Sequence, residues 1–401
     1  MPSLQARRNL PAPRCMRCFL YRHATMEHFS LQLAVRTLAS HGKAAELAVY
    51  IPSSMRPGIA PLTSLRFFAA MVVVIFHYNL TRAIVPVPVT DFGYEAVTFF
   101  FVLSGFILAY AHGVPRAALN IGPKEFFAAR LARICPAYYV GFLLVVLLFI
   151  AAGILARLAA LPAALVLAMA QSWIPQFALS LSPPAWSLSN EMFFYLLFPA
   201  LWTTTRHVSH ATSLVISAGL VLGAALVRNA IPTDDETWNN FRLYFPLLNL
   251  PQFILGMSMG YFFLVIRCSE RVYAGFFLGG LAMLCLMVLA ESRTGWIAES
   301  ATLSTIFGSI IFGAAGMKGF MRTVLSAPPL ILLGEASYGI YILHFPIWLW
   351  WNHYTRIVHQ LGWSSGADFG AYLLLVVFAS IAVLVFIERP ARRAVRVKRP
   401  Q

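Results

Sequence analysis

The stretch LTSLRFFAAMVVVIFHYN, residues 62–79, decides the fold class, because an apolar run long enough to cross a bilayer carries two ionisable side chains. A helix that spans the hydrocarbon core needs about 20 mostly apolar residues. Similar runs recur along the chain: of its 401 residues, 59% are hydrophobic and 11% are charged. A soluble domain carries about 25% charged residues. The sequence therefore excludes an ordinary water-soluble enzyme and predicts an all-α, polytopic transmembrane helix bundle.

Eleven apolar segments are candidates for membrane helices. They run over residues 62–82, 94–112, 136–156, 158–174, 188–205, 211–228, 246–266, 273–290, 298–316, 330–352 and 368–388. If the basic leader, the basic tail and the basic loop 116–133 all face the cytoplasm, the number of crossings is even. We therefore expect about ten (10–11) membrane helices. The weakest candidates are 158–174, which proline interrupts, and 298–316, which begins with polar residues.

The positive charge of the chain lies mainly at its two ends. The formal charge is +15, and of the 30 Lys and Arg residues 8 precede residue 61 and 6 lie between Arg389 and Arg399. Positive flanks of this kind are typical of cytoplasmic segments beside an anionic leaflet. We therefore predict membrane lipids, and no nucleic acid, as partners of these charges. The predicted location is a bacterial inner (plasma) membrane, with both termini cytoplasmic.

The sequence predicts three parts. Residues 1–60 form a basic leader expected to be disordered, 61–390 form the transmembrane domain, and 391–401 form a basic cytoplasmic tail. The leader lacks the continuous apolar core and small-residue cleavage site of a secretory signal. Met55 offers an alternative start immediately before the first span.

A CxxC motif in the leader is the one pattern that resembles a metal site. Cys15 and Cys18 are followed by His23 and His28. The spacings fit a zinc finger poorly, and no helix pattern surrounds them. We therefore predict no metal site.

Arg66 and His77 are the two ionisable residues of the opening stretch. Eleven residues at 1.5 Å rise separate them by about 16 Å along a helix, and successive 100° turns leave them within about 20° of one face. Holding an ionisable group inside a bilayer costs several kcal/mol, so such a group is a functional candidate. The structural alternatives are a snorkelling arginine and an interfacial histidine bonded to a neighbour.

A second candidate group is the pair Arg130 and Arg133 in EFFAARLARICPAYY, residues 125–139. Three positions apart at the entry to a helix, the two side chains share a face. Guanidinium forks suit phosphate oxygens well. Simple positive-inside topology would explain this pair equally well.

Two further spans carry polar residues at unexpected places. PPAWSLSNEMFFYLLFPAL, residues 183–201, places Glu191 inside an aromatic helix, where a carboxylate must be paired, hydrogen-bonded or protonated. EASYGIYILHFPIWLW, residues 335–350, contains His344 near Tyr338 and Tyr341. Glu191 could orient or neutralise a catalytic group, or form half of a buried ion pair with an arginine.

Taken in order, these motifs resemble the acyltransferase 3 family of integral membrane acyltransferases over about residues 60–390. The matching motifs are Arg66 with His77, FFVLSGF at Phe100–Phe106, Arg130 with Arg133, W-S-L-x-x-E-x-x-F-Y at Trp186–Tyr195 and S-Y-x-x-Y-x-x-H-x-P at Ser337–Pro346. One departure is Thr98, which stands where many members carry an acidic residue before the FF. The role of that acid could pass to Glu95 or Glu191, or to no residue.

The resemblance implies an acyltransferase that transfers groups other than aminoacyl groups. Its donor would be acyl-CoA, with acetyl-CoA the expected form, used as a substrate and not as a permanently bound cofactor. Its acceptor would be a hydroxyl of a carbohydrate, such as a cell-surface polysaccharide or lipopolysaccharide. Acylation of a secondary metabolite such as a glycosylated macrolide is an alternative, and so is a membrane transporter that uses the same buried polar residues.

The expected roles are as follows. His77 and Glu191 are catalytic, Arg66, Arg130 and Arg133 bind the donor, and Trp186, Tyr338 and His344 bind substrate. Histidine has an ordinary pKa of about 6.5, which suits a general base at neutral pH. An acyl-imidazole intermediate on His77 is a second route. Ser104 lacks the context of a nucleophile elbow, and we assign it to helix packing.

Overall fold

A computed structural model describes residues 56, 58–79, 93–155, 158–290, 296–358 and 365–397, without the side chains of 290, 296–300, 355–358, 396 and 397. The chain divides into two units, Met1–Met55 and Arg56–Gln401, and every described residue lies in the second. The leader with its CxxC motif lies outside the described residues. The division into leader, transmembrane domain and tail therefore stays a prediction.

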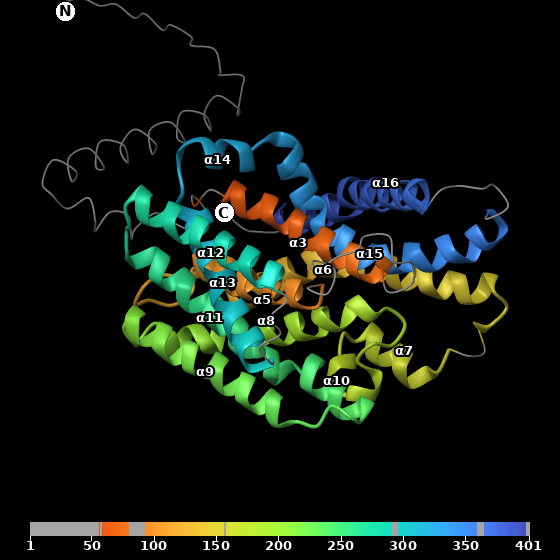
Figure 1. Cartoon of the computed structure of the whole chain (residues 1–401), viewed down its shortest axis with the longest axis horizontal. Helices are drawn as coiled ribbons and strands as arrows, with labels where there is room; N and C mark the ends of the chain where they lie inside the picture. Colours follow the sequence, from red (N-terminus) through yellow and green to blue (C-terminus); the bar gives the residue numbers. More distant parts are fainter. Residues whose placement is uncertain are drawn as a thin grey trace, which may run out of the picture. The chain divides into compact units, whose positions relative to one another are not determined.

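Every regular element in the described ranges is helical, because a chain in lipid must satisfy its backbone polar groups within itself. The α-helices are α3 (Ala60–Asn79), α5 (Glu95–His112), α6 (Pro123–Ala151), α7 (Ala160–Leu167), α8 (Trp186–Thr205), α9 (His210–Ala230), α10 (Glu236–Tyr244), α11 (Pro246–Val265), α12 (Glu270–Ala290), α13 (Trp296–Gly316), α14 (Gly319–Leu325), α15 (Pro328–Val358), α16 (Ser365–Val383) and α17 (Arg389–Val397) (Figure 1). The short elements are the 3₁₀ turns η3 (Gln171–Trp173), η4 (Pro175–Phe177) and η5 (Pro183–Ala185), and the π-turn η7 (Leu384–Glu388). The predicted all-α polytopic class is confirmed.

Eight helices in the described ranges are long and apolar enough to cross a membrane, or nine if the bent pair α13–α14 is one span. The expected number was about ten. The difference lies in α8, which has the length of a span but carries Ser187, Ser189, Asn190 and Glu191 in its first two turns. The weak candidate at 298–316 lies within the single helix α13, and α14 follows it after a bend of 101°.

The candidate span at 158–174 does not form one long helix. Its eight-residue α7 is about 12 Å long, less than half of the roughly 30 Å hydrocarbon core. The chain then continues through η3, η4 and η5 to α8. Side chains satisfy some of the backbone groups of this irregular segment: the Gln171 amide donates to the Ala185 carbonyl (2.9 Å) and the Ser172 hydroxyl to the Trp186 carbonyl (2.8 Å).

Helix α6 begins earlier than the sequence pattern indicates. The expected span started at residue 136, but the helix starts at Pro123 and runs for 29 residues. Arg130 and Arg133 therefore lie two turns inside a helix and not in a loop. The basic loop is correspondingly shorter, because α5 ends at His112.

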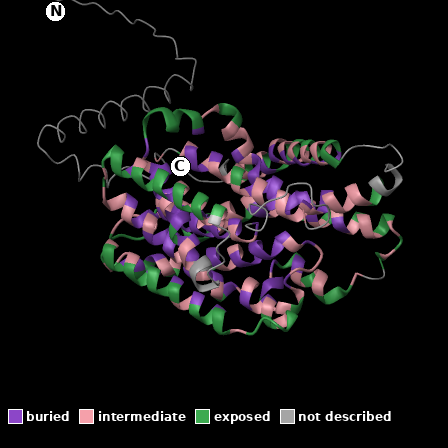
Figure 2. Cartoon of the chain, in the orientation of Figure 1, coloured by how far each residue is buried: buried purple, intermediate pink, exposed green. Residues whose placement is uncertain are grey.

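Helix α5 lies at the centre of the bundle, where it packs most extensively against α11, and α3 packs against α15 (Figure 1). Buried residues gather in this centre, whereas the outer helices α9 and α12 expose much of their apolar surface (Figure 2). The exposed apolar surface is what lipid contact requires of a membrane protein.

Three glycines set the close crossing of α5 and α11. A Cβ on Gly105 would collide with the Phe253 carbonyl, and a Cβ on Gly256 would collide with the Val102 carbonyl. A Cβ on Gly260 would meet the Phe106 carbonyl at 2.7 Å. Gly256 and Gly260 thus form a GxxxG motif through which α11 packs closely on α5.

Hydrogen bonds identify the two ends of the bundle. At one end, which we call the basic end, Arg56 before α3 donates to the carbonyls of Tyr110 (2.5 Å) and Gly113 (2.9 Å) at the end of α5. At the opposite end, the Tyr78 hydroxyl in the last turn of α3 donates to Asp368 of α16 (2.7 Å). Arg66 lies toward the basic end of α3 and His77 toward the opposite end.

Candidate active site

A cavity of about 270 Å³ lies between α3, α5, α6, α8 and α15. Four of its lining residues carry charged side chains, namely Arg66, Arg130, Arg133 and Glu191. Gly58 and Ile59, before the start of α3, line it as well, so the cavity reaches the basic end of the bundle. Four charged groups around one cavity in an apolar bundle mark a candidate site for a polar ligand.

Arg130 is held by aromatic rings. Its guanidinium carbon lies 5.9 Å from the centroid of Phe126, one turn earlier on α6, and 5.8 Å from that of Tyr195 on α8. Its Nε atom is buried and has no hydrogen-bond partner within the described part of the chain. Cation–π contacts hold the side chain at the wall of the cavity.

Glu191 is held by two hydroxyl groups. The Tyr195 hydroxyl, one turn later on α8, donates a short hydrogen bond to its Oε1 atom, and the Ser104 hydroxyl of α5 donates to the same oxygen (3.0 Å). Ser104 also lines the cavity. Besides packing α5 against α8, Ser104 therefore bonds the carboxylate that lines the cavity with the three arginines.

His77 presents a defined nitrogen. Its Nδ1 atom lies 2.9 Å from the Val73 carbonyl, which can only accept, so Nδ1 carries the proton and Nε2 has the free lone pair in the neutral ring. His77 is not among the residues that line the cavity with Arg66. Its ring centroid lies 5.0 Å from that of His344.

His344 is completely buried in α15. Its Nδ1 atom donates to the carbonyl of Tyr341 (2.7 Å) and lies 3.2 Å from that of Ile340, while its Nε2 atom has no partner among the described residues. Tyr341 connects this histidine with the cavity, because its ring lies 6.3 Å from His344 and the residue also lines the cavity. The two histidines and the arginine cavity are therefore neighbouring parts of one region.

The residues expected to bind substrate lie in different surroundings. Tyr338 lines the cavity and donates from its hydroxyl to the Ile134 carbonyl (2.7 Å). Trp186 does not line it: only 5% exposed, it stacks on Tyr94 with 5.6 Å between centroids and packs against Tyr244 at 5.0 Å. The roles of Trp186, Tyr338 and His344 stay predictions.

Tyr94, which precedes α5, fixes the position of Trp186. Burial raises the pKa of Tyr94 well above its ordinary value, so its hydroxyl keeps its proton and donates to the Leu243 carbonyl (2.6 Å). Glu95 begins α5 next to it and is not among the lining residues of the cavity. Of the two carboxylates considered for the missing family acid, Glu191 is the one that faces the cavity.

The described residues contain no group of three or more His, Cys, Asp or Glu side chains arranged to hold a metal ion. The four candidate ligands from Cys15 to His28 lie outside the described residues.

Comparison with known proteins identifies the family. The sequence model of the acyltransferase 3 family, described as an acyltransferase domain, matches residues 60–387. The chain belongs to the acyltransferase 3 family. It is accordingly an integral membrane acyltransferase, of the class that transfers groups other than aminoacyl groups, as the sequence motifs predicted.

Three relatives illustrate the range of the acyltransferase 3 family. Acyltransferase MdmB of Streptomyces mycarofaciens is 28% identical over 84% of this chain and 93% of its own length. O-acetyltransferase OatA of Staphylococcus aureus is 25% identical over 73% of this chain, which spans only 51% of OatA. Exopolysaccharide production protein ExoZ of Rhizobium meliloti is 28% identical over 77% of this chain and 92% of its own length. No solved structure matches the chain.

Proposed function

We propose that this acyltransferase moves an acyl group, in the first place acetyl, from acyl-CoA to a hydroxyl of a carbohydrate such as a cell-surface polysaccharide or lipopolysaccharide. The observation that carries the proposal is the cavity that Arg66, Arg130, Arg133 and Glu191 line inside an apolar bundle. Coenzyme A carries a pyrophosphate and a 3′-phosphate. Arginine binds phosphate oxygens through paired, charge-assisted hydrogen bonds.

We propose that the arginines bind the anionic phosphates of the donor and that the histidines act at its thioester. Arg66 and His77 lie about 16 Å apart along α3. Phosphates bound at Arg66, Arg130 and Arg133 would let the long, uncharged pantetheine arm extend toward His77 past Tyr341. The donor would enter from the basic end, which we propose to be cytoplasmic.

His77 is the proposed general base. Its Nδ1–H donates to the Val73 carbonyl, which leaves Nε2 to accept the proton of the acceptor hydroxyl. The hydroxyl oxygen bonds to the acyl carbon, the C–S bond breaks, and the leaving sulfur takes the proton from His77. Glu191 would offset one of the positive charges in the cavity. An acyl-imidazole on His77 remains the second route.

The carbohydrate acceptor is proposed from the printed names of relatives. ExoZ is an exopolysaccharide production protein, and OatA is an O-acetyltransferase. MdmB, which covers more of this chain than either, is named only as an acyltransferase, and its name specifies no acceptor. A secondary-metabolite hydroxyl stays the second candidate acceptor. The transporter alternative loses its support, because the chain belongs to an acyltransferase family.

We also propose a bacterial inner (plasma) membrane as the location, with both termini in the cytoplasm. The basic residues Arg56, Arg116 and Arg267 lie at the basic end, which the positive-inside rule places in the cytoplasm.

The experiment that tests the function uses protein purified into phospholipid nanodiscs and acetyl-CoA labelled in the acetyl group. With candidate glycans present, we expect release of free coenzyme A and label in the glycan. Mass spectrometry of surface polysaccharide and secreted metabolites from a deletion strain would identify the acceptor. The deletion strain shows which acceptors are no longer acetylated. If the purified protein consumed no acetyl-CoA with any of these acceptors, the proposed donor would be contradicted.

A further inference from the structure

The last span keeps a row of buried residues from Tyr372 to Glu388, and a π-turn forms the last interval of this row. Tyr372, Val376, Ser380, Leu384 and Glu388 follow one another at intervals of four and are all fully buried. In an ideal α-helix each interval of four turns the side chain by about 40°, so Glu388 would point about 160° away from Tyr372. The π-turn η7, closed by the Arg389 N–H on the Leu384 carbonyl, takes more residues per turn and opposes this drift.

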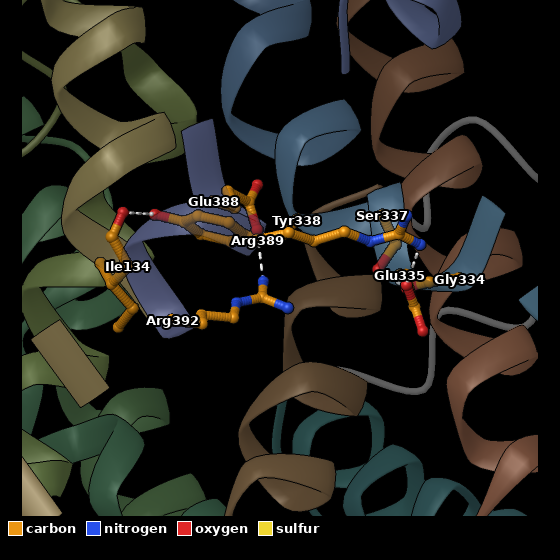
Figure 3. A network of polar contacts seen from close by, with 8 residues as sticks. All are labelled: Ile134, Gly334, Glu335, Ser337, Tyr338, Glu388, Arg389 and Arg392. Atoms are coloured by element: carbon orange, nitrogen blue, oxygen red, sulfur yellow. Dashed lines mark hydrogen bonds and ion pairs between the residues drawn. The ribbon is translucent and has the colours of Figure 1, made fainter. Parts of the chain in front are cut away.

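Inward rotation gives Glu388 a buried partner (Figure 3). Arg392, one turn later on α17, donates a short hydrogen bond to Glu388 Oε2, and the side chain of Arg392 is 24% exposed. The other ion pair of this turn differs: Arg389 and Glu335 lie 2.7 Å apart, with side chains 39% and 40% exposed. One pair is thus directed into the protein and the other lies at its surface.

The buried pair adjoins the arginine cavity. Both η7 and α17 pack against α6, which carries Arg130 and Arg133, and η7 also packs against α15. Arg392 lies close enough to Arg133 and to Arg130 for their charges to act on one another. Glu388 interacts in the same way with Arg133 and Arg66.

The balance of charge in this region favours an anion. Arg66, Arg130, Arg133 and Arg392 bring four positive charges, while Glu191 and Glu388 bring two negative charges. Like charges in a medium of low polarity repel strongly unless a counter-charge lies between them. Arg392 Nε and Glu388 Oε1 are also buried without hydrogen-bond partners within the described residues.

We propose that Arg392 is a fourth cation of the donor site and contacts a phosphate group of the nucleotide thioester, and that Glu388 is the positioning residue that holds it there. The inference rests on the proposed function. In this proposal the π-turn directs the side chains of Glu388 and Arg392 toward the cavity.

The test measures the affinity for coenzyme A of the full-length protein in nanodiscs of phosphatidylcholine alone, by isothermal titration calorimetry, together with the KM and kcat for acetyl-CoA. R392Q should raise the dissociation constant and the KM about tenfold and leave kcat within about twofold. R392K should recover part of the affinity, since it keeps the charge and loses the fork. R389Q is the matched control and should change neither constant by more than about twofold.

A double-mutant cycle separates positioning from folding. E388Q should weaken coenzyme A binding about threefold in the parent protein and have no further effect in R392Q. Thermal unfolding of each variant shows whether it is folded. If R392Q is not folded, R392K takes its place in the cycle.

Three outcomes would overturn the inference. The first is unchanged coenzyme A affinity in folded R392Q while R133Q weakens binding. The second is an equal loss in R389Q, which would indicate a general effect of surface charge. The third is a loss in R392Q that appears only when the nanodiscs contain phosphatidylglycerol, which would assign Arg392 to a lipid headgroup. Failure of the unsubstituted protein to bind coenzyme A would instead overturn the proposed function, and this inference with it.

Discussion

At the scale of single residues, His77 is defined by one hydrogen bond. The carbonyl of Val73 fixes the tautomer from within the same helix, so no separate carboxylate is needed to orient the ring. In the proposed mechanism the basic nitrogen then points away from the backbone of α3, toward the acyl donor.

Replacing His77 tests this assignment. H77A should lower the rate of acetyl transfer by about 10²- to 10⁴-fold, because a positioned general base contributes that much. The assay is consumption of labelled acetyl-CoA by the purified variant. H353A, which removes an exposed histidine further along α15, is the control and should keep full activity. Near-normal transfer by H77A would rule the assignment out.

Arg133 should act on the donor and not on the chemical step. R133Q removes a guanidinium that lines the cavity, so we expect the KM for acetyl-CoA to rise at least tenfold with kcat changed less than threefold. Steady-state kinetics at fixed acceptor concentration measures both constants. R116Q, at an exposed loop residue with the same charge, should behave like the parent protein. If R133Q left the KM for acetyl-CoA unaltered, Arg133 would contribute to membrane topology and not to donor binding.

The sequence predicted the charged part of this site well and its neutral part poorly. Arg66, Arg130, Arg133 and Glu191 were recognisable because charge is rare in apolar segments. Hydroxyl groups are common in membrane helices and gave no comparable signal, so Ser104 was assigned to helix packing and its bond to Glu191 was not predicted. Its contact with Glu191 depends on how α5 packs against α8, and the sequence of a single helix does not determine that packing.

At the scale of helices, the crossing of α5 and α11 depends on the absence of side chains. Gly105 and Gly256 each face a backbone carbonyl of the other helix. Since α5 carries Ser104 and α11 packs against α8, the spacing of this crossing also sets the walls of the cavity.

Adding one methyl group at this crossing should destabilise the protein. G256A forces α5 and α11 apart, and overpacking of this kind costs about 1–3 kcal/mol. Thermal unfolding in nanodiscs should show a lower midpoint and reduced transfer activity. G219A is the control, because a Cβ on Gly219 of α9 meets nothing within 4 Å. A G256A midpoint equal to that of G219A would contradict the packing argument.

Helix boundaries were harder to predict than helix existence. Residues 123–135 contain four charges and look like a loop, yet α6 starts at Pro123 because proline suits a first helical turn and Arg130 and Arg133 face a polar cavity inside the bundle. The π-turn at Leu384–Glu388 was not predicted from the sequence either. Arg392 was accordingly attributed to a basic tail.

At the scale of the whole molecule, the two ends of the bundle should face different compartments. The loop after α5 lies at the basic end, and the acidic loop between α9 and α10 lies at the other. Replacing all five native cysteines by Ser, and then introducing either A118C or T233C, gives one reporter for each loop.

A membrane-impermeant maleimide added to intact spheroplasts should label T233C but not A118C, if the basic end is cytoplasmic as proposed. Both should react after permeabilisation, which serves as the positive control. Labelling of A118C alone in intact spheroplasts would reverse the proposed orientation.

The length of α15 determines how deep the histidines lie. Its 31 residues extend about 46 Å, well beyond a hydrocarbon layer of about 30 Å. Trp350 and Tyr354 stack at 5.7 Å near its far end, where such rings seek the level of the lipid headgroups. Six residues separate Trp350 from His344, so the imidazoles would lie only about 9 Å beneath that level. A glycan held at the outer surface would then meet the acyl group just under the headgroups, and the donor's arm would have to reach across the remaining thickness of the bilayer.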